Sequence, residues 1–104
     1  MTEVIVTTVF PPAPGAKERL IAALRDGIPA VHSEDGCILY AIHDAEDGTI
    51  VMVEKWASRE DLDAHAGGPA LNKLDALVAP HLGRPVTWTT MTPIPAGTDR
   101  QGML

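Results

Sequence analysis

The stretch GCILYAIHDAEDGTIVMVEKWASREDLDAH, residues 36–65, decides the fold of this chain. Residues 37–43 and 49–56 both favour β-strand, and the Asp-Gly signal in the short segment between them predicts an antiparallel hairpin. Ser58 is typical of a helix N-cap, because acidic residues follow it in the first turn. The stretch therefore predicts two adjacent strands that lead directly into a capped helix.

On the N-terminal side, a further strand and a helix are expected. Residues 3–10 are rich in Val, Ile and Thr, which favours a strand that ends at Pro11. From about residue 15, apolar residues recur at three- and four-residue steps and predict a helix with one apolar face. Gly27 and Pro29 interrupt this pattern, so we expect a kink or a break there.

On the C-terminal side, residues 67–69 break the short helix, and Pro69 is well placed to start another one. A stripe of leucines and a valine follows, and Gly83 is a candidate C-terminal cap. Residues 84–94 favour a last strand. The remaining tail, 95–104, is rich in Pro and Gly and is expected to be flexible or packed on a partner subunit.

The order strand, helix, strand, strand, helix pair, strand is that of a ferredoxin-like α+β fold. It predicts one domain over residues 1–94, with a four-stranded antiparallel sheet and helices on one face. The other face carries many apolar side chains and has no element of this chain to cover it. We therefore expect a homodimer in which two sheets pack against each other.

The composition excludes several classes of function. Among 104 residues there are 14 acidic and 8 basic ones, a formal net charge of −6, which disfavours nucleic acid and an electrostatic membrane contact. The single cysteine, Cys37, permits no internal disulfide, and no signal peptide is recognisable, so we expect a cytoplasmic protein. The apolar runs are far shorter than a membrane helix requires.

Two side chains near the end of the quoted stretch are candidates for chemistry. His65 follows Leu62 by three residues, so both should point from the helix towards the sheet. His65 is a candidate general base, and the alternative is a partly buried histidine that binds a backbone carbonyl. Trp56 either stacks on a flat aromatic ligand or fills the core.

Strand periodicity groups the neighbouring candidates. Alternation puts Cys37 with Leu39, Ala41 and His43 on one face of their strand, and Tyr40 with Ile38 and Ile42 on the other. Tyr40 either lends its hydroxyl to a pocket or packs, and His43 is expected to be exposed or at a pocket rim. Elsewhere, Trp88 is expected in the core or in an interface. Glu54, unusual in mid-strand, either faces the dimer side, paired with a basic group, or lies in a pocket.

No cofactor or metal is predicted from motifs. His43, Glu54 and His65 lack the close spacing of metal ligands. Cys37 has no activating base beside it in sequence. Because no glycine-rich phosphate loop is present, nothing indicates a nucleotide or a flavin.

Four short motifs, in this order, resemble the antibiotic biosynthesis monooxygenase family, with quinol monooxygenases of the YgiN type closest in style. They are residues 14–15 (PG), 36–40 (GCILY), 54–56 (EKW) and 62–65 (LDAH). The resemblance covers about residues 3–94. One departure is Glu-Asp-Gly at 34–36, where the family usually has Glu-Pro-Gly.

The resemblance implies ferredoxin-like homodimers that form a joined α+β barrel. It also implies oxidation of a small aromatic phenol or quinol with O2, without metal, flavin or haem. By match to the family's strand-end Trp and helix His, it assigns His65 as catalytic base and Trp56 as a pocket wall. Tyr40 and His43 are added as substrate-binding residues from the adjacent strand.

Two other functions are open. Haem-degrading relatives use a helix His with a strand Asn and a helix Trp, whereas this chain has His65, Thr7 or Thr8, and about Asp75 at those places. The required triad is therefore missing. The other alternative is a dimeric barrel that binds a small ligand without catalysis, because a fold alone does not determine function.

Overall fold

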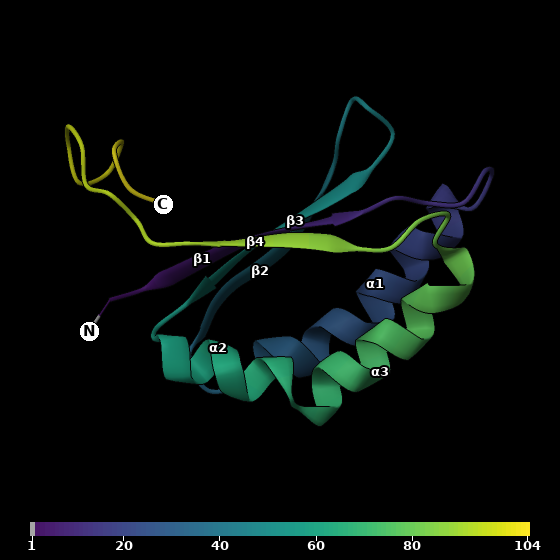
Figure 1. Cartoon of the computed structure of the whole chain (residues 1–104), viewed down its shortest axis with the longest axis horizontal. Helices are drawn as coiled ribbons and strands as arrows, with labels where there is room; N and C mark the ends of the chain where they lie inside the picture. The colour runs from purple at the N-terminus through teal and green to yellow at the C-terminus, as the bar shows by residue number, and fades with distance from the viewer. Residues whose placement is uncertain (1) are drawn as a thin grey trace.

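The computed structural model describes residues 2–104, so residue 1 of the predicted domain lies outside the described residues. The elements follow the order β1 (Val4–Phe10), α1 (Lys17–His32), β2 (Cys37–Asp44), β3 (Ile50–Trp56), α2 (Arg59–Ala66), α3 (Pro69–Val78), the 3-10 turn η1 (Ala79–His81) and β4 (Thr87–Met91). In this part of the chain the strands form one antiparallel sheet, ordered β2-β3-β1-β4, with the helices on one face (Figure 1). The predicted ferredoxin-like α+β fold is confirmed. None of the helices in residues 2–104 is long and apolar enough to cross a membrane.

The core lies between the sheet and the helices. Every second residue of β3, from Ile50 to Trp56, is buried, as period-two alternation requires of a strand with one covered face. Leu20 and Leu24 of α1 and Leu74 of α3 are almost fully buried against it. Each such side chain contributes about 1.5–3 kcal/mol by leaving water. This core holds β3 and α2, which carry the candidate site.

A β-bulge in β2 overturns one prediction. Cys37 pairs with Trp56, but Leu39 already pairs with Lys55, so Ile38 is an extra residue in the strand. Cys37 consequently lies on the face of Trp56, towards the helices. The period-two assignments of Cys37 to the face of Leu39 and of Ile38 to the face of Tyr40 were wrong, because the bulge shifts the alternation by one.

Helix α1 is continuous, so of the predicted kink or break at Gly27 and Pro29, the break does not occur. A Cβ at Gly27 would lie 2.3 Å from Leu74 Cδ1, which shows how closely α1 and α3 approach there. Pro29 is exposed, three residues before the helix ends, while Ile28 and Val31 are buried beside it. Packing of those neighbours offsets the backbone hydrogen bond that proline removes.

The end of α3 also differs from the prediction. The helix stops at Val78, two residues before Pro80, and continues only as the turn η1. Gly83 is therefore not a cap. Its backbone N–H donates to the carbonyl of Pro11 at 2.9 Å and ties this segment to the end of β1. The last strand, Thr87–Met91, is shorter than the predicted one and exposed along its length.

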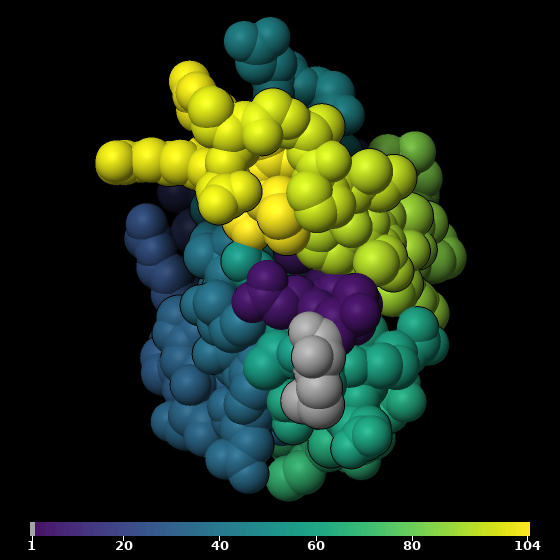
Figure 2. Space-filling model, turned by 90° about the vertical axis from the view of Figure 1, so that its left-hand side faces the viewer, coloured from purple at the N-terminus to yellow at the C-terminus, as the bar shows by residue number. Residues whose placement is uncertain are grey.

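The tail returns towards its own chain. Figure 2 shows it in yellow, above the purple first strand. Lys55, on the sheet face away from the helices, donates a hydrogen bond to the carbonyl oxygen of Leu104 and pairs with Glu3 at 3.4 Å. That the tail packs on a partner subunit stays a prediction.

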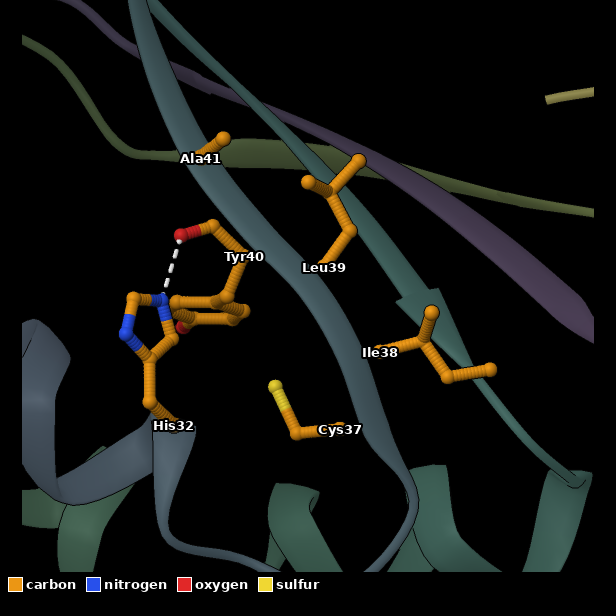
Figure 3. A pocket seen from close by; sticks show the side chains of 6 residues that line it. All are labelled: His32, Cys37, Ile38, Leu39, Tyr40 and Ala41. Atoms are coloured by element: carbon orange, nitrogen blue, oxygen red, sulfur yellow. Dashed lines mark hydrogen bonds between the residues drawn. The ribbon is translucent and has the colours of Figure 1, made fainter.

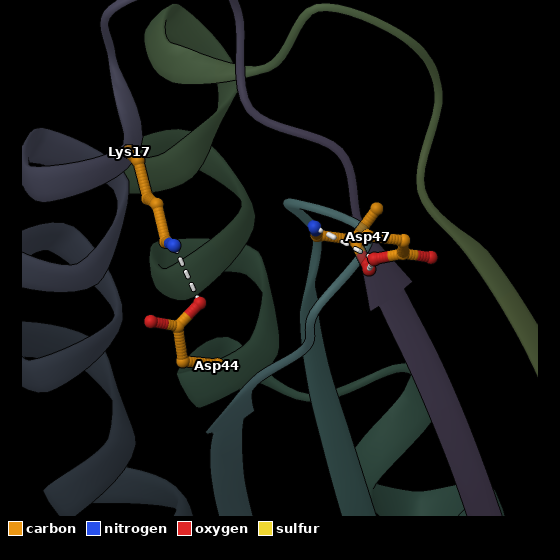
Figure 4. Close-up of polar contacts among 4 residues, drawn as sticks. Lys17, Asp44 and Asp47 are labelled. Atoms are coloured by element: carbon orange, nitrogen blue, oxygen red, sulfur yellow. Dashed lines mark hydrogen bonds and ion pairs between the residues drawn. The ribbon is translucent and has the colours of Figure 1, made fainter.

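The hairpin between β2 and β3 is fixed by polar contacts at its base. Lys17, at the start of α1, forms an ion pair with Asp44 (Figure 4). Asp47 Oδ1 accepts hydrogen bonds from the Thr49 backbone N–H at 2.9 Å and from its hydroxyl at 2.6 Å. These bonds lower the pKa of the exposed Asp47 carboxyl. The Asp-Gly turn predicted from the sequence is confirmed.

Candidate functional site

Three of the predicted site residues form one aromatic cluster between the sheet and α2. The ring centroids of Trp56 and His65 are 4.5 Å apart, with 31° between their planes. Tyr40 meets His65 edge-on at 5.3 Å and Trp56 at 6.3 Å. His65 is 3% exposed and Trp56 is fully buried. The structure therefore brings β2, β3 and α2 together at these side chains.

The start of α2 explains why His65 reaches this position. Ser58 caps the helix as predicted, its Oγ accepting from the Asp61 backbone N–H at 3.1 Å. Leu62 and His65 are the buried residues of α2. Because the helix starts three residues after Trp56, two of its turns return the chain over the indole ring.

Glu34 is a partner of His65 that the sequence did not reveal. His65 Nδ1 lies 2.6 Å from Glu34 Oε1, across 31 residues of chain. The sequence offered a backbone carbonyl as the alternative partner of His65. The observed partner is a carboxylate, which can both orient an imidazole and stabilise its charged form.

The turn that carries Glu34 is held against α2. Gly36 adopts φ +77°, and its carbonyl accepts from the Ala57 backbone N–H at 2.8 Å. A Cβ at Gly36 would lie 2.1 Å from Asp61 Oδ2, so only glycine fits this approach. The glycine of the family-like motif thus positions the carboxylate beside His65.

A second carboxylate, Glu54, is buried on the helix side of the sheet. Its Oε2 accepts from the Thr8 hydroxyl at 2.8 Å and its Oε1 from Trp56 Nε1 at 3.1 Å. The alternative that Glu54 faces the dimer side was therefore wrong. Its shared parity with Met52 and Trp56 was the signal for this placement.

Burial shapes the ionisation of the groups around the cluster. Burial, and then the nearby carboxylates of Glu54, Asp75 and Glu34, raise the pKa of Tyr40 well above its usual range. Burial and Glu34 likewise raise the pKa of the Cys37 thiol. Both groups are therefore protonated at neutral pH, and Cys37 is a poor nucleophile.

A cavity of about 370 Å³ opens beside β2 (Figure 3). It is lined by His32, Cys37, Ile38, Leu39, Tyr40 and Ala41. In Figure 3 the side chains of His32, Cys37 and Tyr40 lie on one side of the strand, and those of Ile38 and Leu39 on the other. His32 Nε2 donates to the Tyr40 carbonyl at 3.0 Å. Tyr40 is thus the residue that the cavity shares with the aromatic cluster.

Two residues lie outside this arrangement. His43 pairs with Val51 on the opposite face of the sheet, where its Nδ1 donates to the Val51 carbonyl at 3.1 Å. The structure therefore does not bring His43 to His65. Trp88 is 70% exposed, so its expected place in the core was wrong and an interface is the alternative that stays.

The polar atoms that face the cluster are few. Within residues 2–104, no hydrogen-bond partner is seen for His65 Nε2 or for the Tyr40 hydroxyl. No group of three or more His, Cys, Asp or Glu side chains in that range is arranged to hold a metal ion. The arrangement offers one imidazole nitrogen and one phenol hydroxyl for hydrogen bonds to a ligand.

Comparison with known proteins identifies a family of similar sequences. Residues 3–75 match the sequence model of the antibiotic biosynthesis monooxygenase family. The chain is 37% identical over 92 residues to a Mycobacterium tuberculosis protein named "Putative monooxygenase Rv0793", covering 88% of this chain and 91% of the relative.

Solved structures agree with the fold. The structure of Rv0793 has a TM-score of 0.82 at 35% identity, covering 93% of this chain and 100% of the other. Protein SO0527 from Shewanella oneidensis has a TM-score of 0.78 at 28% identity, covering 88% and 90%. A conserved protein from Methanosarcina mazei shares the fold with a TM-score of 0.79 at 18% identity, covering 88% and 92%.

The family match covers the strands β1 to β3, the helix α2 and all residues of the aromatic cluster. It supports a monooxygenase-like function in general terms. This chain belongs to the antibiotic biosynthesis monooxygenase family.

Proposed function

We propose that this protein is a monooxygenase that oxidises an aromatic phenol or quinol with O2, without a metal or an organic cofactor, and that His65 is its general base. The observation that carries the proposal is the contact of His65 Nδ1 with Glu34, which leaves Nε2 available beside Trp56 and Tyr40. The family match supports the reaction class.

The chemistry balances with O2 as the only co-reactant. His65 Nε2 takes the proton of a phenolic hydroxyl, and the resulting phenolate is electron-rich at its ortho and para carbons. A C–O bond forms between O2 and one such carbon that bears hydrogen, and the His65 imidazolium returns its proton to the resulting peroxide, giving a hydroperoxide. Loss of the carbon-bound hydrogen and cleavage of the O–O bond then give a quinone and water. One oxygen atom enters the product, and the substrate supplies all four electrons.

The cavity beside β2 is the proposed entrance for the substrate. Its volume of about 370 Å³ lies at the small end of the range for ligand pockets, which suits a compact aromatic compound. His65 and Trp56 do not line it, whereas Tyr40 contacts both the cavity and His65. The proposal therefore requires Tyr40 to move aside when the substrate binds.

A homodimer is part of the proposal. The sheet face away from the helices presents apolar side chains that no element in residues 2–104 covers fully, among them Leu39, Val51 and Val53. Packing this face against a second copy would remove it from water and close a barrel around the two sheets.

The experiment is an oxygen-uptake assay with a panel of hydroquinones and anthrones. We expect O2 consumption that His65→Gln lowers by about 10²- to 10⁴-fold, the usual contribution of a positioned base. His81→Gln is the matched control, because His81 lies in η1 and makes no contact with the cluster. Equal uptake by the wild type and His65→Gln would show that another group is the base.

One observation favours binding without catalysis as a second candidate. The near-complete burial of His65 and Trp56 is what a packing role would produce. In that case a hydroquinone would quench the tryptophan fluorescence or shift cavity resonances without any O2 uptake. The same panel of compounds therefore separates the two functions.

A further inference from the structure

The shortest side-chain hydrogen bond to the aromatic cluster joins the carboxylate of Glu34 to the imidazole of His65, at 2.6 Å. We propose that Glu34 is a positioning residue, which fixes His65 in the tautomer that carries hydrogen on Nδ1 and presents Nε2 as proton acceptor. The inference deepens the proposed function and rests on it, because it concerns the histidine that would act as base.

The tautomer follows from the contact. An ionised carboxylate has no hydrogen to donate, so Nδ1 must donate across the 2.6 Å to Glu34 Oε1. In a neutral imidazole the other nitrogen is then an acceptor. Side-chain exposures of 4% for His65 and 21% for Glu34 mean that water competes little for this bond.

Packing keeps the ring from turning over. Trp56 covers one face of the imidazole at 4.5 Å, and Tyr40 meets it edge-on at 5.3 Å. A half-turn of the ring would exchange nitrogen for carbon opposite Glu34 and lose the hydrogen bond. The ring is thus held by aromatic contacts, and the carboxylate selects which nitrogen faces away.

The backbone of Glu34 is held on both sides. The N–H of Glu34 donates to the Val31 carbonyl at 3.0 Å, and its own carbonyl accepts from the Cys37 N–H at 3.3 Å. Its second oxygen lies at the corner between α2 and α3, where a Cβ on Gly68 would approach it to 3.3 Å. Glu34 therefore belongs to a turn that both neighbouring elements anchor.

The Glu34 carboxylate also compensates the charge that His65 gains as a base. When His65 accepts a proton, a positive charge forms inside the molecule, and an adjacent carboxylate compensates it. The other titratable groups around the pair are Asp75 on α3, Tyr40 and Cys37 on β2, and Glu54 on β3. Among the described residues, Glu34 is hydrogen-bonded to the imidazole, and none of these four groups is.

The test measures the tautomer directly and needs no substrate. In 15N-labelled protein, two-bond 1H–15N correlations report which ring nitrogen carries hydrogen, and His65→Gln identifies the His65 signals. We expect the Nδ1–H tautomer in the wild type. Glu34→Gln should populate the Nε2–H form, because an amide can also donate to Nδ1. Glu34→Asp should also populate the Nε2–H form, because the aspartate side chain is one methylene shorter and its carboxylate does not reach Nδ1.

Asp35→Asn is the matched control, since it removes a neighbouring, exposed carboxylate that has no contact with His65. It should leave the tautomer unchanged. With a substrate that the wild type oxidises, Glu34→Gln should lower kcat by about 10- to 100-fold, which is the range for partners that orient a functional histidine. The KM should be nearly unchanged.

The outcomes separate the two proposals. An Nε2–H tautomer in the wild type, or an unchanged tautomer in both Glu34 variants, would overturn the role of Glu34. The wild-type measurement decides the point even if a variant does not fold. An absence of O2 uptake with a wild-type Nδ1–H tautomer would count against the proposed function and not against the contact.

Discussion

Glu54 and Trp56, two residues apart on β3, are hydrogen-bonded to each other through Oε1 and Nε1 at 3.1 Å. Alternation places both side chains on the helix side of the sheet, and Thr8 of the adjacent strand donates to the other carboxylate oxygen at 2.8 Å. A buried carboxylate thus serves two neutral donors and fixes the indole that packs on His65.

Removing this acceptor should destabilise the fold. Glu54→Leu leaves the Trp56 N–H and the Thr8 hydroxyl buried without a partner, at a cost of about 1–3 kcal/mol in the free energy of unfolding. Glu54→Gln keeps an acceptor and should cost less. Urea denaturation measures both, with the exposed Glu46→Gln as control. A Glu54→Leu variant as stable as the wild type would contradict the role given to these bonds.

The turn at Gly36 should be intolerant of any side chain. Gly36→Ala imposes a positive φ on alanine, at about 1–2 kcal/mol, and also pushes on Asp61. Gly15→Ala is a matched control, because Gly15 has a similar φ of +74° and nothing within 4 Å of a built Cβ. We expect Gly36→Ala to lower the midpoint of thermal unfolding more than Gly15→Ala does. Equal losses would mean that the contact with Asp61 relaxes freely.

Tyr40 gives a pH prediction with a definite sign. Burial raises the pKa of its phenol, so the folded protein binds this proton more tightly than the unfolded chain. The stability that results is present below the ordinary tyrosine pKa of about 10 and is lost as pH rises above it.

The chain has a single tyrosine, so the measurement is direct. Tyrosinate absorbance should be absent from the native protein at pH about 10, where an unperturbed tyrosine is half ionised. It should emerge together with the loss of circular dichroism at higher pH. Ionisation of Tyr40 near pH 10 in a fully folded protein would show that its hydroxyl is solvated.

The uncovered sheet face predicts how dimerisation can be disrupted. Val53 lies in the central part of that face, paired with Thr7 and Ala41 across the neighbouring strands. Val53→Lys should convert a dimer into a monomer in sedimentation velocity, because a charge would be buried at the interface. Ala22→Lys, on the exposed surface of α1, should have no effect. A wild type that sediments as a monomer at micromolar concentration would refute the dimer.

Local patterns were sufficient to predict most elements. Val, Ile and Thr in β1, the apolar stripe of α1 and the cap at Ser58 each report on neighbours within one or two turns. They also placed His65 against the sheet, where the structure has it. Tyr40 and Trp56 followed from the hairpin, because strands joined by a short turn lie side by side.

Features that depend on tertiary contacts could not be predicted from these local patterns. The bulge at Ile38 arises from pairing with β3 and leaves no local signature, so the face of Cys37 was assigned wrongly. Pro29 is tolerated in α1 because the helix packs well around it. Glu34 meets His65 only because α2 folds back over the turn at Gly36. In the sequence, Glu34 is one of two adjacent acidic residues, and nothing in that local pattern indicates the contact.

Trp56 and Trp88 occupy opposite extremes, 0% and 70% exposed. The protein consequently contains two tryptophan fluorophores that report on different places. Trp56 should emit at short wavelength, with its intensity governed by the imidazole stacked on it, whereas Trp88 should emit like the free amino acid in water. A Trp88→Phe variant would isolate the signal of the site, and Trp56→Phe that of the edge strand, so ligand entry and subunit association could be followed separately in unlabelled protein.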